Sequence, residues 1–160
     1  MMKKLFFSVF LLLMMAIGAM AQTTLFSEDF EGGAMPDGWT TEGPGSWSVG
    51  SGDYSSTTGA GQGTYNALIT HSDRDNVTKL ISPEIDLSSV TSATLSFMHI
   101  ERSWTGDIDE LRVYYRASSG DSWAQIAEYT SAYASWTTEE DLVLPNTSST
   151  YQLAFEMTDN

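Results

Sequence analysis

The segment Asp109-Glu-Leu-Arg-Val-Tyr-Tyr-Arg116 alternates between core-type and polar or aromatic residues along its length. Leu111, Val113 and Tyr115 share one face of an extended backbone, and the residues between them share the other face. This period of two is typical of a half-buried strand, because a helix places its apolar residues three or four positions apart. The segment therefore predicts a β-strand.

The same alternation recurs in residues 93–99 and 151–157, and turn residues interrupt the chain every eight to twelve positions. No segment after residue 21 has the spacing of an amphipathic helix. Residues 43–63 hold seven of the 13 glycines and predict a long surface loop, with a short strand at 46–49. The pattern as a whole predicts an all-β sandwich of two antiparallel sheets.

The first 21 of the 160 residues predict a cleavable signal peptide. Lys3 and Lys4 precede an apolar run from Leu5 to Ile17, and Ala19-Met-Ala21 has the form of a cleavage site. The apolar run is too short to span a bilayer. We expect an exported protein, secreted or at the cell surface, whose mature part is one domain of 139 residues, 22–160.

Charge and cysteine content exclude several classes of function. Cleavage removes Lys3 and Lys4. Five of the seven basic residues then remain with 21 acidic ones, which gives a net charge of −16. Such a chain should repel phosphate backbones and anionic membranes, so we expect no nucleic-acid partner and no membrane insertion after cleavage. Without cysteine there is no disulfide framework, thiol nucleophile or zinc–thiolate site.

The residues offer little for catalysis. Only His71 and His99 could act as a histidine base, and there is no G-x-S-x-G or H-E-x-x-H motif. His99 shares a strand face with Leu95 and Phe97, which favours a core histidine, and His71 lies in a polar loop. Paired carboxylates could serve a glycosidase, but adjacent acids are expected by chance in so acidic a chain. We therefore expect a protein that is not an enzyme.

Calcium is a better use for the surplus of oxygen ligands, because this cation takes six to eight oxygens. Asp29 and Glu31 lie two residues apart, as do Asp107 and Asp109, and this spacing puts each pair on one face of an extended backbone. Solvated surface acids are the alternative interpretation. Trp104, in a polar turn, is the tryptophan that core packing explains least, and it is a candidate ligand-binding residue.

Five short motifs, in order, resemble one family. They are Ser27-Glu-Asp-Phe-Glu-Gly-Gly33 with Pro36-Asp-Gly-Trp39, then Leu80-Ile-Ser-Pro-Glu-Ile-Asp-Leu87, Ala93-Thr-Leu-Ser-Phe97, Asp109-Glu-Leu-Arg-Val-Tyr-Tyr-Arg116, and the pair Trp123 and Trp136. Together they resemble the cleaved-adhesin, or choice-of-anchor J, domains of Bacteroidetes surface proteins, which are similar in fold to MAM domains. The resemblance covers roughly residues 25–160.

The resemblance implies a jelly-roll β-sandwich that is a non-catalytic module of an exported protein. It implies a host or matrix protein, or a glycan, as the ligand. It also implies calcium, held by Glu31, with Asp29, and by Asp109. The family continues after the strand at 151–157 into a last strand carrying an Asp-Asp pair, so we expect the sequence to stop one strand short of the complete domain.

Two other functions stay open. The chain could be the N-terminal accessory domain of a larger secreted peptidase or glycan-degrading enzyme. It could also be a carbohydrate-binding module, in which Trp104 would stack on a sugar.

Overall fold

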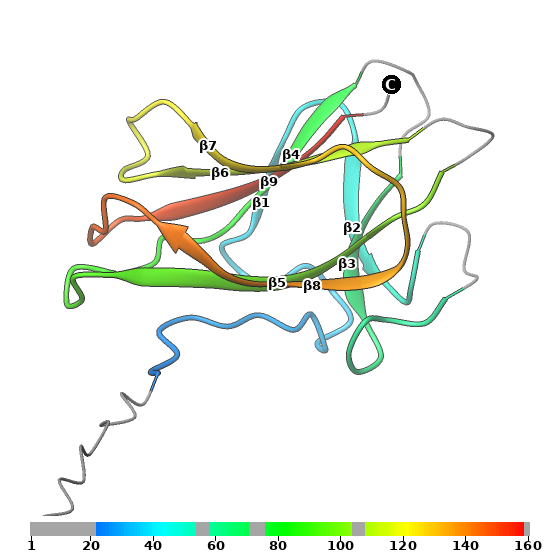
Figure 1. Ribbon diagram of the computed structural model, residues 1–160, viewed down its shortest axis with the longest axis horizontal. Helices are drawn as coiled ribbons and strands as arrows, with labels where there is room; N and C mark the ends of the chain where they lie inside the picture. The colour runs from blue at the N-terminus through cyan, green and yellow to red at the C-terminus, as the bar shows by residue number, and fades with distance from the viewer. Residues whose placement is uncertain (1–21, 54–57, 71–75, 104–107, 159–160) are drawn as a thin grey trace, which may run out of the picture.

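The computed structural model describes residues 22–53, 58–70, 76–103 and 108–158, so the predicted signal peptide lies outside the described residues. Every element in the described part is a β-strand. The strands are β1 (Thr40–Glu42), β2 (Ser46–Gly50), β3 (Asn66–Thr70), β4 (Val77–Ile81), β5 (Ala93–Glu101), β6 (Glu110–Arg116), β7 (Ala124–Tyr129), β8 (Tyr133–Leu144) and β9 (Gln152–Thr158). They form two layers of antiparallel strands (Figure 1). The all-β sandwich expected from the alternation is confirmed.

The first layer is a continuous five-stranded sheet in the order β1-β4-β9-β6-β7. Its central strand, β9, pairs with β6 along its whole length and with β4 from Ala154 to Thr158, so that Phe155 lies opposite both Leu80 and Val113. The central position buries side chains on both faces of β9: Leu153 and Ala154, which point to opposite faces, are both buried. The predicted strand at 151–157 is confirmed, within one residue at each end.

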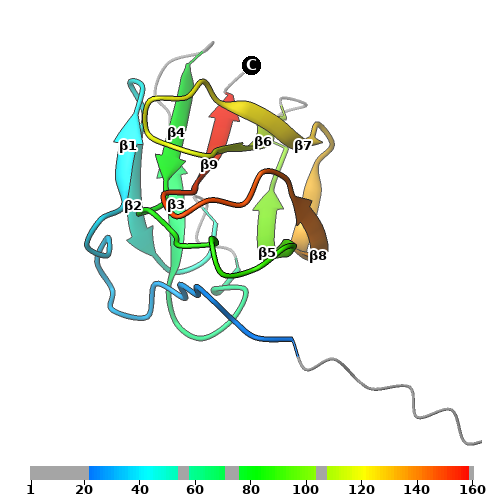
Figure 2. The ribbon, with the colours of Figure 1, turned by 90° about the vertical axis from the view of Figure 1, so that its left-hand side faces the viewer.

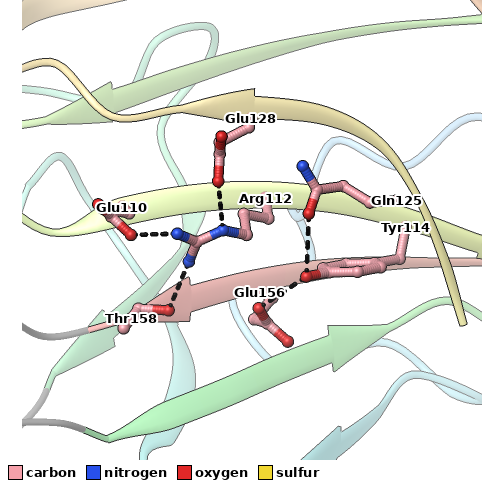
Figure 3. Close-up of polar contacts among 7 residues, drawn as sticks. All are labelled: Glu110, Arg112, Tyr114, Gln125, Glu128, Glu156 and Thr158. Atoms are coloured by element: carbon pink, nitrogen blue, oxygen red, sulfur yellow. Dashed lines mark hydrogen bonds and ion pairs between the residues drawn. The ribbon is translucent and has the colours of Figure 1, made fainter.

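The outer face of this sheet carries a polar network on β6 and its neighbours (Figure 3). The Arg112 guanidinium donates to Glu110, to Glu128 at 2.6 Å and to the Thr158 hydroxyl at 2.9 Å. On the same face, the Tyr114 hydroxyl donates to Glu156 at 3.1 Å. The residues that alternate with Leu111 and Val113 thus join three strands from outside, which accounts for the polar half of the sequence pattern.

The second layer consists of two separate two-stranded sheets, β2-β3 and β5-β8. Figure 2 shows the two pairs side by side below the five-stranded sheet, with β3 and β5 as the neighbouring strands. No hydrogen bonds join β3 to β5 within the described residues. The second layer therefore differs from the single continuous sheet that a complete two-sheet sandwich would have.

The compact core lies at one end of the sandwich. Buried side chains of Ile85, Leu87, Leu144, Tyr151 and Leu153 form a cluster there, against which Leu95 and Phe155 pack. An isolated bridge between Ile85 and Tyr151 ties this end together. No helix among the described residues is long and apolar enough to cross a membrane.

Candidate functional site

The acidic N-terminal segment folds into a tight turn. The Glu28 carboxylate accepts a hydrogen bond from the Phe30 amide at 2.7 Å, and the Asp29 carboxylate accepts one from the Glu31 amide at 3.0 Å. Phe30 has a positive φ of 59°, and its ring packs on Trp39 with 5.4 Å between centroids. These contacts show why the Ser27–Gly33 motif has acids next to a phenylalanine: each carboxylate satisfies an amide of the turn.

Glu31 fastens this segment to the loop before β3. Its Oε1 accepts hydrogen bonds from the amides of Thr64, at 2.7 Å, and Tyr65, at 2.9 Å. These two bonds lower the pKa of Glu31, the one from Tyr65 contributing most. Gly63 must lack a side chain here, because its φ is +69° and a Cβ would lie 2.3 Å from Glu31 Oε1.

The three predicted calcium ligands therefore separate into two groups. Asp29 and Asp109 both line the cavity between the two layers, although 80 positions separate them in the sequence. The Glu31 carboxylate is instead turned toward the amides of Thr64 and Tyr65. Within the described ranges, no three histidine, aspartate or glutamate side chains gather closely enough to hold a metal. The calcium site stays a prediction.

An open cavity lies between the two layers, with a volume of about 1320 Å³. Its walls come from both layers: Leu68 of β3 and Phe97 of β5 on one side, and Leu80, Phe155 and Met157 of the five-stranded sheet on the other. Folded interiors leave few voids larger than a water molecule, so this part of the interior is not close-packed as an ordinary core is. It exceeds the ~300–1,000 Å³ of ordinary small-ligand sites.

Charged groups stand around this apolar space. Five carboxylates and one guanidinium line it, belonging to Glu28, Asp29, Asp53, Glu101, Asp109 and Arg102. Arg102 forms an ion pair with Asp53 at 3.1 Å. The cavity is therefore apolar in its walls and negative in its charge, which favours an occupant that is apolar and carries a positive group.

His99 lies at the edge of this cavity, buried between two carboxylates. Its Nδ1 is 2.8 Å from Glu101 Oε1, and its Nε2 is 3.2 Å from Glu139 Oε1. Burial alone would lower the pKa of His99, but the hydrogen bonds and charges of Glu101 and Glu139 outweigh it and raise the pKa. The expectation of a satisfied core histidine is confirmed, since only 6% of the residue is exposed.

Aromatic rings enclose the imidazole and complete the cluster. The rings of Tyr129 and Tyr133 lie 4.6 and 4.7 Å from that of His99, between centroids. Burial, reinforced by the charge and hydrogen bond of Glu139, raises the pKa of Tyr129 to about 12. Burial also raises the pKa of Glu101, although His99 acts against it. Each nitrogen of the imidazole thus faces a carboxylate oxygen.

Two buried polar atoms in the cavity wall have no hydrogen-bond partner in the described structure: the indole Nε1 of Trp47, a donor, and Oε2 of Glu101, an acceptor. The Glu101 side chain is only 1% exposed. Sequence reasoning missed both residues. A signal existed for Glu101, because it follows His99 by two positions and so shares its strand face.

The remaining predicted residues divide between the described and undescribed parts. Trp104 and His71 lie outside the described residues, as does Asp107. Trp136 lies in β8, as the resemblance implied, and donates from its indole to the Gly59 carbonyl at 2.9 Å. Trp123 precedes β7 by one residue, and the Arg116 guanidinium stacks over it at 4.3 Å. Both rings have structural contacts.

No protein-family model, curated protein or solved structure matches this chain.

Proposed function

We propose that this protein is an exported, non-catalytic binding module that recognises a host or matrix protein or a glycan, and that calcium stabilises it. The observation that carries the proposal is the interlayer cavity of about 1320 Å³, with apolar walls and five carboxylates. An open space of this kind between two layers suits binding, because ligand sites are mostly apolar hollows that carry a few polar or charged groups.

The state of His99 supports a non-catalytic role. A general base needs a nitrogen directed at the proton that it removes, whereas both nitrogens of His99 face carboxylates. The pKa values of His99 and Glu101 depart from their usual ranges, which is common at active sites, but structural causes account for both: burial raises the pKa of Glu101, and the carboxylates of Glu101 and Glu139 raise that of His99 against the effect of its burial.

The binding role is tested with immobilised matrix proteins and a glycan array, assayed with the mature chain. We expect saturable binding to at least one of these probes and no hydrolysis of peptide or glycoside substrates. Hydrolysis that is lost in the His99→Asn variant would overturn the non-catalytic assignment, since that change removes the only described histidine without adding bulk.

Calcium, where bound, would supply a divalent charge that offsets the repulsion between carboxylates. Asp29 and Asp109 suit this role because both line the same cavity. Glu31 would hold the Asp29 segment in place through its bonds to Thr64 and Tyr65. Carboxyl oxygens are the ligands that calcium prefers, and extracellular calcium is abundant enough for weak sites.

Melting curves with calcium and with a chelator test the metal. A cation that binds only the folded state raises the melting temperature, and Asp109→Asn should remove that rise. Asp121→Asn is the matched control, because Asp121 is exposed and lies in the turn at the other end of β6. The calcium proposal fails if the curves coincide, or if both variants respond alike.

A further inference from the structure

We propose that the interlayer cavity binds an extended peptide strand of a partner protein, which enters between β3 and β5 and joins the two halves of the second layer into one sheet. This proposal rests on the binding function above and names the partner chemistry and the site. The bound strand would carry apolar residues at alternate positions and a basic residue near its N-terminal end.

The first argument is that β3 and β5 each have one open edge. β3 pairs only with β2, and β5 pairs only with β8, among the described residues. An isolated two-stranded sheet is marginally stable, and an open edge is a template for another strand. The opposite layer has no such break, because its five strands are continuous from β1 to β7.

The second argument is direction. β4 and β6 are both antiparallel to β9, so both begin at the end of the sandwich where β9 ends, at Thr158. Only residues 71–76 separate β3 from β4, and only residues 102–109 separate β5 from β6, so β3 and β5 both run toward this end. One strand that runs the opposite way between them would be antiparallel to both and would give the order β2-β3-strand-β5-β8.

The third argument is packing. The face that such a strand would cover is apolar, with Leu80, Phe155 and Met157 opposite the gap and Leu68 and Phe97 beside it. Alternate side chains of a strand point to one face of the sheet, so apolar residues at every second position would fill the cavity. Filling it would remove these walls from water and restore the close packing of an ordinary core.

The fourth argument is hydrogen bonding. The cavity wall holds an unpaired donor, Trp47 Nε1, and an unpaired acceptor, Glu101 Oε2. A buried polar atom without a partner is costly, and a peptide supplies both a carbonyl for the indole and a positive donor for the carboxylate. Because Glu101 ends β5, an antiparallel partner would meet it near its own N-terminal end.

The test uses two synthetic peptides with the mature chain. The peptide TKTVTVTVT places lysine and three valines on one face, and TETVTVTVT replaces the lysine by glutamate. Fluorescence anisotropy should show saturable binding of the lysine peptide, about tenfold tighter than the glutamate peptide, as expected for one charge-assisted hydrogen bond. Hydrogen exchange should slow in β3 and β5 together when the lysine peptide binds.

Variants locate the contact. Glu101→Gln should reduce the tenfold preference to near one, and Trp47→Phe should weaken both peptides without changing the preference. The two variants act on different atoms, so one that fails to fold leaves the other informative. Asp121→Asn is the surface control and should bind as the unchanged protein does.

Several results would overturn the proposal. They are equal binding of a peptide N-methylated at alternate amides, protection outside β3 and β5, or no binding of either peptide. Edges that are already protected in the free chain would mean that its own residues fill the gap. A dimer in sedimentation velocity would assign the gap to a second copy. If the matrix or glycan probes still bind, any of these results overturns only the peptide-strand site and not the proposed binding function. The failure of one proposal can therefore be told from the failure of the other.

Discussion

His99 illustrates how a single side chain can suggest catalysis and serve structure. A strand residue that alternates with Leu95 and Phe97 is predicted to face the core, and the structure places it there. Its partner Glu139 could not be predicted, because it is 40 positions away and meets His99 only through the pairing of β5 with β8. Sequence periodicity gives the face of a residue, whereas long-range register gives its contacts.

The titration of His99 is the prediction at this scale. We expect an imidazole pKa above the usual 6.5, because two carboxylates stabilise the charged ring. A pKa raised by folding stabilises the protein fully below pH 6.5, and this contribution is lost as the pH rises through the folded value. NMR of the imidazole carbon-bound protons measures the pKa directly.

Glu139→Gln should lower that pKa, since it removes one of the two negative charges. Glu140→Gln is the matched control, because Glu140 is exposed on the opposite face of β8. An His99 pKa below 6.5 in the unchanged protein, or an equal response to both variants, would contradict the role assigned to the carboxylates.

At the scale of elements, the alternation of apolar and polar residues predicted where the strands lie. It did not predict that the second layer is split into two separate sheets. The strands at 93–99, 109–116 and 151–157 follow from the sequence because each buries one face of its side chains in a regular pattern. β7 and the long β8 are harder to predict, because their burial is partial and irregular. The break between β3 and β5 has no local signal, since strand pairing depends on which edges meet in space.

Two leucines provide a test of the incomplete core. Leu80 and Leu87 are each 3% exposed, but Leu80 lines the cavity and Leu87 belongs to the closed cluster. Leu→Ala in a core costs about 2–5 kcal/mol, depending on how much contact is lost. We expect Leu87→Ala in the upper part of that range and Leu80→Ala in the lower part, measured by urea unfolding. Equal costs would argue that the wall around Leu80 is as tightly packed as the cluster.

The outer network of the five-stranded sheet gives a third prediction. Arg112 stands between Glu110 and Glu128 on neighbouring strands, so Arg112→Met would leave the carboxylates to repel one another (Figure 3). We expect a loss of about 1–2 kcal/mol in unfolding free energy at low salt, because the side chain is only partly exposed. Urea unfolding at 1 M salt should show a smaller loss, since salt screens the repulsion. A loss that does not change with salt would point to packing of the arginine stem instead.

At the scale of the whole molecule, several of the acidic side chains have specific structural roles. The sequence has a surplus of acidic residues, and the structure gives three of them different roles. Glu31 binds the amides of a loop, Asp29 accepts a hydrogen bond from a turn amide, and Glu101 contacts His99. These roles could not be predicted from spacing, because each depends on backbone amides or rings brought from elsewhere in the chain. Export, calcium and the ligand remain predictions that rest on the residues and on the resemblance.

Hydrogen exchange of residues 22–160 without peptide, resolved along the sequence, tests most directly whether the second layer is open. Amides of β9 and β6, which are paired on both sides, should exchange slowly, and β3 and β5 should each contain fast-exchanging amides on their unpaired edges. Uniformly slow exchange across β3 and β5, equal to that of β9, would contradict an open second layer and the binding site inferred from it.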